Sequence, residues 1–135
     1  IIGEGGSGGA LGIAVVDRLL TMEYAYYSVI PPEGCAAILW RSREFTERAA
    51  EALRLGGAEL VKQGIADEMI SEPLGGAHRD PEAAADSIRE AIERNLNALC
   101  ATPAETLLEK RYAKYRNMGV YAEGVKAELR QAHAV

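Results

Sequence analysis

The sequence predicts a mixed α/β first half and a helical second half, with the boundary near His78. Three observations support this division. A glycine-rich stretch at Gly3–Gly9 leads directly into an apolar segment of helical composition. Aromatic and β-branched residues, which favour strands, dominate the next two stretches. From Asp80 onward, apolar residues recur at spacings of three and four, as on one face of a helix. We therefore expect one region over residues 1–78 and a helical extension over residues 79–135.

The N-terminal stretch places five glycines within seven residues, and an apolar run follows at once. Two prolines at positions 31 and 32 then stop the β-rich segment that precedes them. The elements expected up to residue 34 are the end of a strand at residues 1–2, a glycine-rich turn to Gly8, a buried helix over residues 9–16, short strands over residues 19–24 and 26–30, and a turn at residues 31–34.

The rest of the chain reads mainly as helix. Up to residue 78 we expect a helix over residues 35–40, an amphipathic helix over residues 44–55, a short helix over residues 58–63, a strand over residues 65–71 and a loop over residues 73–78. Asp80 as N-cap and Pro81 at the first position start a long helix. Thr102 and Glu105 predict a capping box for a last helix that runs to Met118, before a weakly amphipathic tail over residues 120–132.

Composition excludes several classes of protein. The chain has 135 residues, 48% of them hydrophobic and 26% charged, which is typical of one globular domain. The net charge of −5 and the lack of a basic stripe argue against a nucleic-acid partner. No apolar run reaches the length of a membrane span, so we expect no membrane partner. Cys35 and Cys100 match no metal or redox spacing and are expected to be reduced thiols in a cytosolic protein.

The glycine-rich stretch is the candidate functional segment. A turn that feeds a helix N-terminus leaves N–H groups without partners, and the helix dipole adds positive charge there. Such a place can hold an anion or a developing oxyanion. The pattern Gly3-x-Gly5-x-x-Gly8 also matches a dinucleotide fingerprint, with Glu23 about 20 residues on, but Asp17 ends the helix too early for that unit. No Lys-Ser/Thr follows the glycines, as a phosphate-binding Walker loop would need. A flexible linker is disfavoured by the helix that follows.

Other polar residues have a structural interpretation that we favour. Glu4 is expected to satisfy N–H groups of the glycine turn, the tyrosines near residue 25 to pack in strands, and His78 to be solvated or to cap. The basic run over residues 110–116 could meet an acidic partner or a phosphate, but we favour a solvated helix face. The sequence shows no Ser/His/Asp set, no Cys/His pair and no cluster with metal-ligand spacing, so no bound metal is expected.

Three ordered segments resemble one known family. They are GEGGSGGALGIAVVD, YSVIPPEGCAAILW and EPLGGAHRDPEAAA, with RYAKYRNMG near the end. Together they resemble the alpha subunit of the bacterial-type acetyl-coenzyme A carboxylase carboxyltransferase over nearly the whole chain. Members of this family are longer at the N-terminus. The absence of an initiator Met and the strand-like start at Ile1 fit that pattern, so we expect a C-terminal portion of such a subunit.

The resemblance implies a crotonase-like α/β fold, built of ββα units wound into a superhelix and here a fragment followed by a C-terminal helical region. It maps the backbone oxyanion hole of this fold onto Gly8, Gly9 and Ala10. Hydratases of the superfamily carry a catalytic Glu near the position of Ile30, where this chain has no acidic residue, so hydratase or isomerase chemistry is disfavoured. The stretch from Pro32 resembles the PEG-A turn of biotin-dependent carboxyltransferases. The expected substrate-binding residues are Gly5, Gly6, Glu33 and Gly34.

The implied reaction moves a carboxyl group from carboxybiotin to acetyl-coenzyme A and gives malonyl-coenzyme A, the first committed step of fatty acid biosynthesis. The biotin is carried on a partner protein, the biotin carboxyl carrier protein, within an ATP-dependent complex. The resemblance also implies a beta subunit that carries the zinc, an assembly of two alpha and two beta subunits, and a location in the bacterial cytoplasm or plastid stroma. Alternatives are a carboxyltransferase for another acyl group such as propionyl-coenzyme A, a non-catalytic assembly module and, more distantly, a dinucleotide-binding domain.

Overall fold

The structure is a computed structural model in which residues 1–119 are described. Residues 120–132, expected to be weakly amphipathic, lie outside the described residues. The elements run in the order β1 (Ile2–Gly6), α1 (Ser7–Ala14), β2 (Leu20–Ser28), α2 (Pro32–Trp40), the 3-10 turn η1 (Arg43–Phe45), α3 (Thr46–Leu53), α4 (Gly57–Lys62), β3 (Glu68–Ile70), α5 (Pro81–Cys100) and α6 (Ala104–Arg116).

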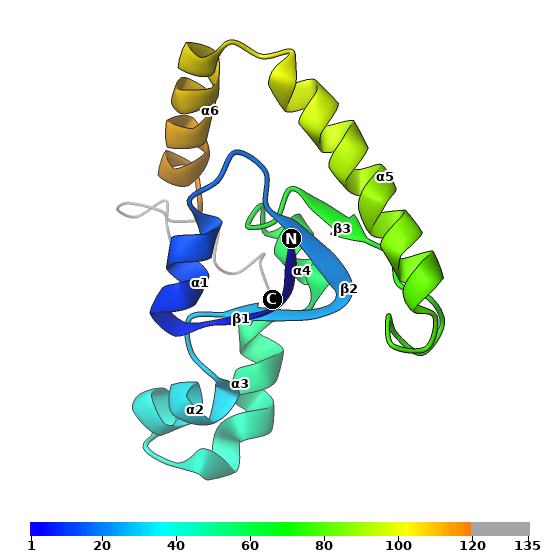
Figure 1. Cartoon of the computed structure of the whole chain (residues 1–135). Helices are drawn as coiled ribbons and strands as arrows, with labels where there is room; N and C mark the ends of the chain where they lie inside the picture. The colour runs from blue at the N-terminus through cyan, green and yellow to red at the C-terminus, as the bar shows by residue number, and fades with distance from the viewer. Residues whose placement is uncertain (120–135) are drawn as a thin grey trace.

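The strands form a small parallel sheet in the order β1-β2-β3, so β2 is central. The first half of β2 pairs with β3, from Leu20 opposite Glu68 to Met22 opposite Ile70. On its other edge β2 pairs with β1, from Ile2 opposite Thr21 to Gly6 opposite Ser28. The register of the β1–β2 pair shifts between Ile2 and Glu4, where β2 holds extra residues that bulge out of the pairing. The structure is therefore mixed α/β with helices around a short parallel sheet, as Figure 1 shows.

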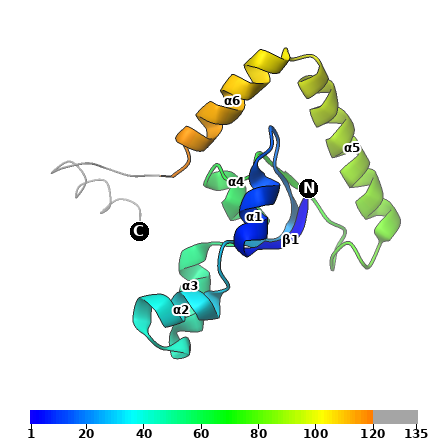
Figure 2. The ribbon, with the colours of Figure 1, turned by 60° about the vertical axis from the view of Figure 1, so that its left-hand side comes forward.

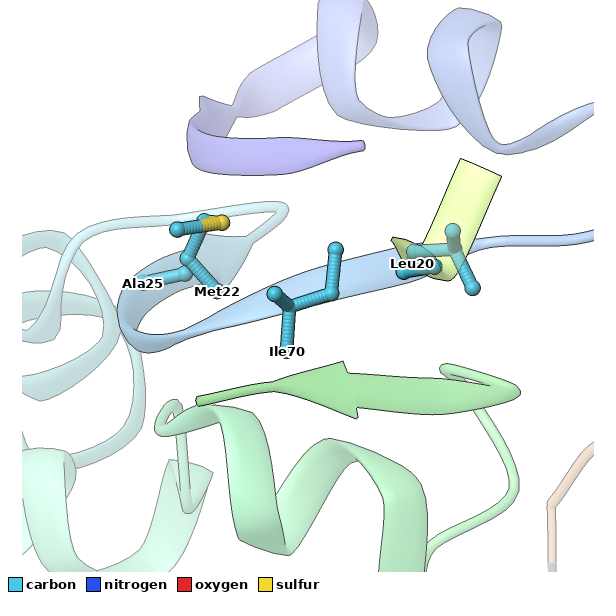
Figure 3. Close-up of a cluster of buried hydrophobic side chains, with 5 residues drawn as sticks. Leu20, Met22, Ala25 and Ile70 are labelled. Carbon is cyan, nitrogen blue, oxygen red and sulfur yellow. The ribbon is translucent and has the colours of Figure 1, made fainter. Parts of the chain in front are cut away.

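Two apolar clusters lie against the sheet, and β2 contributes side chains to both. On one side, Leu20 and Met22 of β2 pack with Ile70 of β3 and with Ala91 of α5, as Figure 3 shows for the labelled residues. The other cluster contains Leu19, just before β2, together with Ile2, Ala14 and the partly buried Val16, Tyr27 and Ile65. The sheet therefore holds α5 on one side and α1 on the other.

Two helical pairs extend from this core. Below the sheet in Figure 1, α2 and α3 lie against each other. The ring centroids of Trp40 and Phe45 lie 6.0 Å apart, and the Arg48 guanidinium lies over the Trp40 ring. Figures 1 and 2 show α5 and α6 joined at one end and diverging, so that α6 returns on the side of α1. The division at residue 78 stays a prediction, although α5 shares a core cluster with β2 and β3.

The prediction for the glycine-rich stretch was wrong in its boundaries. The strand continues to Gly6, and the helix starts at Ser7 and ends at Ala14. The sequence predicts a turn there because glycine adopts backbone angles that are closed to other residues. Here Gly5 and Gly6 pair with Tyr27 and Ser28, so the tertiary partner β2 overrides the local preference.

Four further expectations need correction. The two strands expected over residues 19–30 are one strand, Leu20–Ser28, and Ala25 between them is buried in the core cluster. The expected turn at residues 31–34 is instead the first turn of α2, with Pro32 at its first position. The strand near residue 68 covers only three residues. The capping box is absent: the Thr102 hydroxyl donates to Ala98 of the preceding helix, and Pro103 is the N-cap of α6.

The remaining predicted elements are confirmed with small shifts of their ends. The helices expected near residues 35–40, 44–55 and 58–63 are α2, η1 with α3, and α4. The long helix begins as expected, with the Asp80 carboxylate accepting a hydrogen bond from the Ala83 N–H at 3.0 Å. Cys35 and Cys100 are free thiols.

Candidate functional site

The candidate site begins where β1 passes directly into α1. Gly6 is the N-cap and is extended, with φ −145° and ψ 162°. Ser7 follows with a φ of 57°, a left-handed conformation that non-glycine residues rarely adopt. The chain thereby turns sharply at one residue, and the helix starts without a loop. Gly8 and Gly9 occupy the first turn.

The start of α1 offers N–H groups that no side chain caps. In an α-helix the first four N–H groups have no partner within the helix, which here are those of Gly6, Ser7, Gly8 and Gly9. No acidic residue lies in this first turn to compete for them. Gly8 and Gly9 are exposed, and a Cβ atom built on either would meet nothing within 4 Å. The first turn is therefore open to an anionic group.

Ala10 differs from the two glycines beside it. It is buried, with 3% of its surface exposed. As the fourth residue of α1 its N–H faces the carbonyl of Gly6 within the helix, which is the usual acceptor four residues back. The helix geometry thus favours the N–H groups of Gly8 and Gly9 over that of Ala10 as donors to a ligand.

The sheet brings the start of α2 to the same edge. Because β1 and β2 are parallel and end together, with Gly6 opposite Ser28, the helices that follow them start at one edge of the sheet. Glu33 and Gly34 lie in the first turn of α2, which also lacks a side-chain cap. Glu33 is exposed, whereas a Cβ on Gly34 would touch the Ile30 side chain at 3.0 Å. The sequence-predicted residues around Gly8 and Glu33 thus belong to one edge.

Gly5 is explained by packing. It is buried in β1, and a Cβ atom there would lie 2.8 Å from Cδ2 of Tyr27. The hydroxyl of Tyr27 donates to the carbonyl of Ala10 in α1. Partial burial raises the pKa of the Tyr27 phenol above its usual range, and nearby Tyr115 adds to the effect. Tyr27 thus covers the strand and reaches the helix at the same time, as the expected packing role for this tyrosine required.

Helix α6 supplies residues that the sequence interpretation missed. The Arg111 guanidinium binds both carboxylate oxygens of Asp17, at 2.9 and 2.7 Å. Lys114 binds Asp67, whose carboxylate also accepts the Leu19 N–H at 2.7 Å. The expectation that residues 110–116 form a solvated face is therefore wrong for the side turned toward α1. Their acidic partners lie far away in sequence, and no local pattern signals the pairing.

Glu4 and His78 do not form part of the glycine site. Glu4 is exposed in β1. Because residues 2–6 form a strand, Glu4 is not placed in a glycine turn whose N–H groups it could satisfy. His78 is exposed in the loop after β3 and lines a shallow cavity of about 380 Å³ with Gly3, at the other end of β1. There Glu72 accepts the N–H groups of Tyr24 and Ala77 at 3.0 and 2.8 Å, and so holds the loop against β2.

Two findings concern the described part of the chain only. Within residues 1–119, no group of three or more His, Cys, Asp or Glu side chains is placed to hold a metal ion. In the same residues, no helix combines the length and the apolar character that a bilayer span needs.

Comparison with known proteins decides the family. A family model described as acetyl co-enzyme A carboxylase carboxyltransferase-like matches residues 1–119. The chain belongs to this family. Among curated members of known name, an acetyl-coenzyme A carboxylase carboxyl transferase subunit alpha from Methylococcus capsulatus is 53% identical over 123 residues, which are 91% of this chain and 38% of that protein.

Two further relatives carry the same name. The protein from Geobacter sulfurreducens is 56% identical over 124 residues, covering 92% of this chain and 39% of the relative. The one from Rhodopirellula baltica is 50% identical over 123 residues, covering 91% and 39%. The chain therefore spans about two fifths of the length of these relatives. The family assignment confirms the resemblance seen in the sequence.

Proposed function

We propose that this chain contributes one half of a carboxyltransferase site, which moves a carboxyl group from carboxybiotin to acetyl-coenzyme A and forms malonyl-coenzyme A. Membership of the family and the names of its relatives support this assignment. The observation that carries it is the uncapped first turn of α1, which contains Gly8 and Gly9. A reaction that develops negative charge on oxygen, and needs no side-chain nucleophile, matches such a turn.

The residues at this edge fit the role of neutral hydrogen-bond donors. Carboxybiotin supplies the carboxyl group, and negative charge develops on its ureido oxygen when the nitrogen–carbon bond breaks. The N–H groups of Gly8 and Gly9 would donate to that oxygen, with the dipole of α1 adding to the attraction. Amide N–H groups lose no proton at working pH, and the helix fixes them before the reaction. Ala10 would support them from the buried side of the helix.

The other predicted residues remain proposals at the same edge. Gly6 is exposed at the N-cap of α1, so its backbone could approach a substrate closely. We propose Glu33 and Gly34 as substrate contacts from the start of α2. For Gly5, which was also expected to bind substrate, we propose a place in the strand that supports the site. A crotonase-like fold is proposed for the complete domain, in line with the parallel sheet and its helices.

The partners of the site are also proposals. The relatives are named as alpha subunits, which implies an assembly with a different subunit. We propose a beta subunit that provides the oxyanion hole for the acetyl-coenzyme A enolate, in an assembly of two alpha and two beta chains. A biotin carboxyl carrier protein would deliver the biotin, and the enzyme would act in the cytoplasm or plastid stroma.

The test is carboxyl transfer by the full-length subunit with its beta subunit, measured in reverse as biotin-dependent loss of malonyl-coenzyme A. We expect activity only with both subunits present. Gly9→Pro removes one donor and should lower kcat by about 100-fold to 1,000-fold, the usual effect of losing one oxyanion donor.

Gly12→Ala is the matched control. It lies in the same helix and meets nothing within 4 Å, but its N–H is not among the first four. We expect it to keep the wild-type kcat. A Gly9→Pro enzyme as active as Gly12→Ala would contradict the role of the first turn of α1. A stable complex of wild-type subunits without activity would favour a non-catalytic assembly module.

A further inference from the structure

Helix α1 is poorly suited to hold its own position. It has eight residues, of which Gly8, Gly9 and Gly12 are glycine, and it has no side-chain cap. Each glycine inside a helix lowers helix stability by about 1 kcal/mol relative to alanine. Helices this short are marginal in water without tertiary support. A donor site at its first turn therefore requires that other elements fix the helix.

Two tyrosine hydroxyls supply this support from outside the helix. Tyr27 of β2 donates to the carbonyl of Ala10, near the middle of α1. Tyr115 of α6 donates to the carbonyl of Ala14, at the end of α1, and accepts the N–H of Val16 at 3.2 Å. The carbonyl of Ala14 is one of the last four of the helix, which accept no N–H group within it. It also accepts the N–H of Val16 at 2.7 Å, so Tyr115 reinforces the end of the helix.

Both rings also line one side of the helix. Tyr27 and Tyr115 border an apolar cavity of about 460 Å³, together with Ala10 and Ala14. They contact α1 one turn apart, because their two acceptor carbonyls are four residues apart along the helix. Two contacts one turn apart restrict both rotation about the helix axis and sliding along it.

Tyr115 is itself held firmly. Arg111 and Lys114 precede it by four residues and one residue on α6, and they bind Asp17 and Asp67 respectively. Residues four apart share a helix face, so Arg111 and Tyr115 both point toward the end of α1. The ion pairs thus fix the position of the Tyr115 ring along the axis of α1.

We propose that Tyr27 and Tyr115 are positioning residues, which clamp α1 through its carbonyls and so keep the N–H groups of its first turn aimed at the reacting oxygen. The catalytic part of this role rests on the proposed function. Misplacement of a catalytic group by about 1 Å can slow a reaction about 100-fold, so a small drift of the helix would be felt in kcat.

The test uses three conservative variants of the full-length subunit in complex with its beta subunit. Tyr27→Phe and Tyr115→Phe keep the rings and remove the hydroxyls. Tyr112→Phe is the matched control, because Tyr112 lies on the same helix with 69% of its surface exposed. Its hydroxyl makes no hydrogen bond to residues 1–119.

Hydrogen exchange of the amides in residues 8–16 is the first readout, with the unfolding temperature measured alongside. We expect both clamp variants to exchange this segment about fivefold to tenfold faster than Tyr112→Phe, the effect of one lost hydrogen bond. The rest of the chain should exchange as in the control. Unchanged exchange in residues 8–16 would overturn the clamp, and so would faster exchange spread over the whole chain with a lower unfolding temperature.

The second readout is kcat and KM in the reverse reaction. We expect kcat to fall about tenfold in the clamp variants. The KM for malonyl-coenzyme A should stay unchanged, because the N–H groups of α1 act on the charge that develops in the transition state. A wild-type kcat combined with faster exchange would overturn the positioning role and leave only a structural one. An inactive wild-type complex would overturn the proposed function, and the catalytic role of the tyrosines with it, whereas the exchange result would still decide whether the clamp exists.

Discussion

At the scale of single residues, the glycines of the first stretch have different tasks. Gly8 and Gly9 are exposed at the start of α1, where a side chain would meet open space. Gly5 is buried beneath the ring of Tyr27, where a methyl group would clash. Gly3, in the same strand, has nothing near it. Only the contacts of each position separate the glycine needed for packing from those that expose N–H groups.

This difference predicts a contrast between two alanine substitutions in β1. Gly5→Ala should lower the free energy of unfolding by about 1–3 kcal/mol, because the added methyl group displaces the Tyr27 ring. Gly3→Ala should leave stability unchanged or raise it by less than about 1 kcal/mol, since the space is open. Urea unfolding of the full-length subunit measures both. Equal effects of the two substitutions would show that Tyr27 does not pack on Gly5.

At the scale of elements, close approach and side-chain bonds set how the helices meet the sheet. Gly57 begins α4 against β2, where a Cβ atom would lie 2.6 Å from the carbonyl oxygen of Met22. On the other side, Asn95 of α5 donates to Glu68 of β3 at 2.7 Å, and Arg94 binds the same carboxylate. The hydrogen bond from Asn95 lowers the pKa of Glu68 below its usual value, partial burial opposes the shift, and Arg94 reinforces it.

The lowered pKa of Glu68 predicts a pH-dependent contribution to stability. A carboxylate whose pKa is lowered in the folded state stabilises the fold at pH values above 4.5, its ordinary pKa. This contribution to stability is lost as the pH falls through the pKa of the folded state. We therefore expect Glu68→Gln to be less stable than wild type at pH 7. The difference should shrink as the pH falls below 4.5. Thermal unfolding at several pH values measures it.

Glu93→Gln is the control for this prediction, because Glu93 is exposed on α5. It should follow the wild-type stability at each pH. A Glu68→Gln protein whose stability difference from wild type is constant between pH 7 and pH 3.5 would show that Glu68 does not titrate as a stabilising carboxylate.

At the scale of the whole molecule, α5 and α6 connect the two sides of the sheet. Figure 1 shows α5 along one side and α6 returning to α1 on the other. Ala91 of α5 belongs to the core cluster with Leu20, whereas α6 has no buried residue. The attachment of α6 therefore depends on polar contacts, chiefly those of Arg111 with Asp17 and of Lys114 with Asp67.

This dependence predicts that Arg111→Ala releases α6. The variant should unfold at a lower temperature than wild type, and proteases should cleave within residues 104–116 faster. The difference in unfolding temperature between the variant and wild type should become smaller at high salt, because salt screens the ion pair of the wild-type protein. Lys110→Ala is the control, since Lys110 is exposed on the same helix. Equal cleavage of the two variants would contradict the role of the Asp17 pair.

The sequence by itself determined the family and most of the helices, and it singled out the glycine-rich stretch as a candidate site that stays a prediction. These conclusions depend on local signals, such as the Asp80 cap with Pro81 and the apolar spacing along α5, which neighbouring residues set without help from the rest of the chain. The segments that resemble one family are also continuous stretches of sequence, and the match of the family model over residues 1–119 confirmed the resemblance.

The tertiary structure alone decided where the glycine strand ends, that residues 20–28 form one strand, and which side of α6 faces inward. Each of these depends on a partner distant in sequence. Gly5 is extended because Tyr27 lies opposite it, and Tyr115 reaches Ala14 across 101 positions. Local propensity carries no information about such pairs, because the free energy that decides them comes from contacts formed only when the chain has folded.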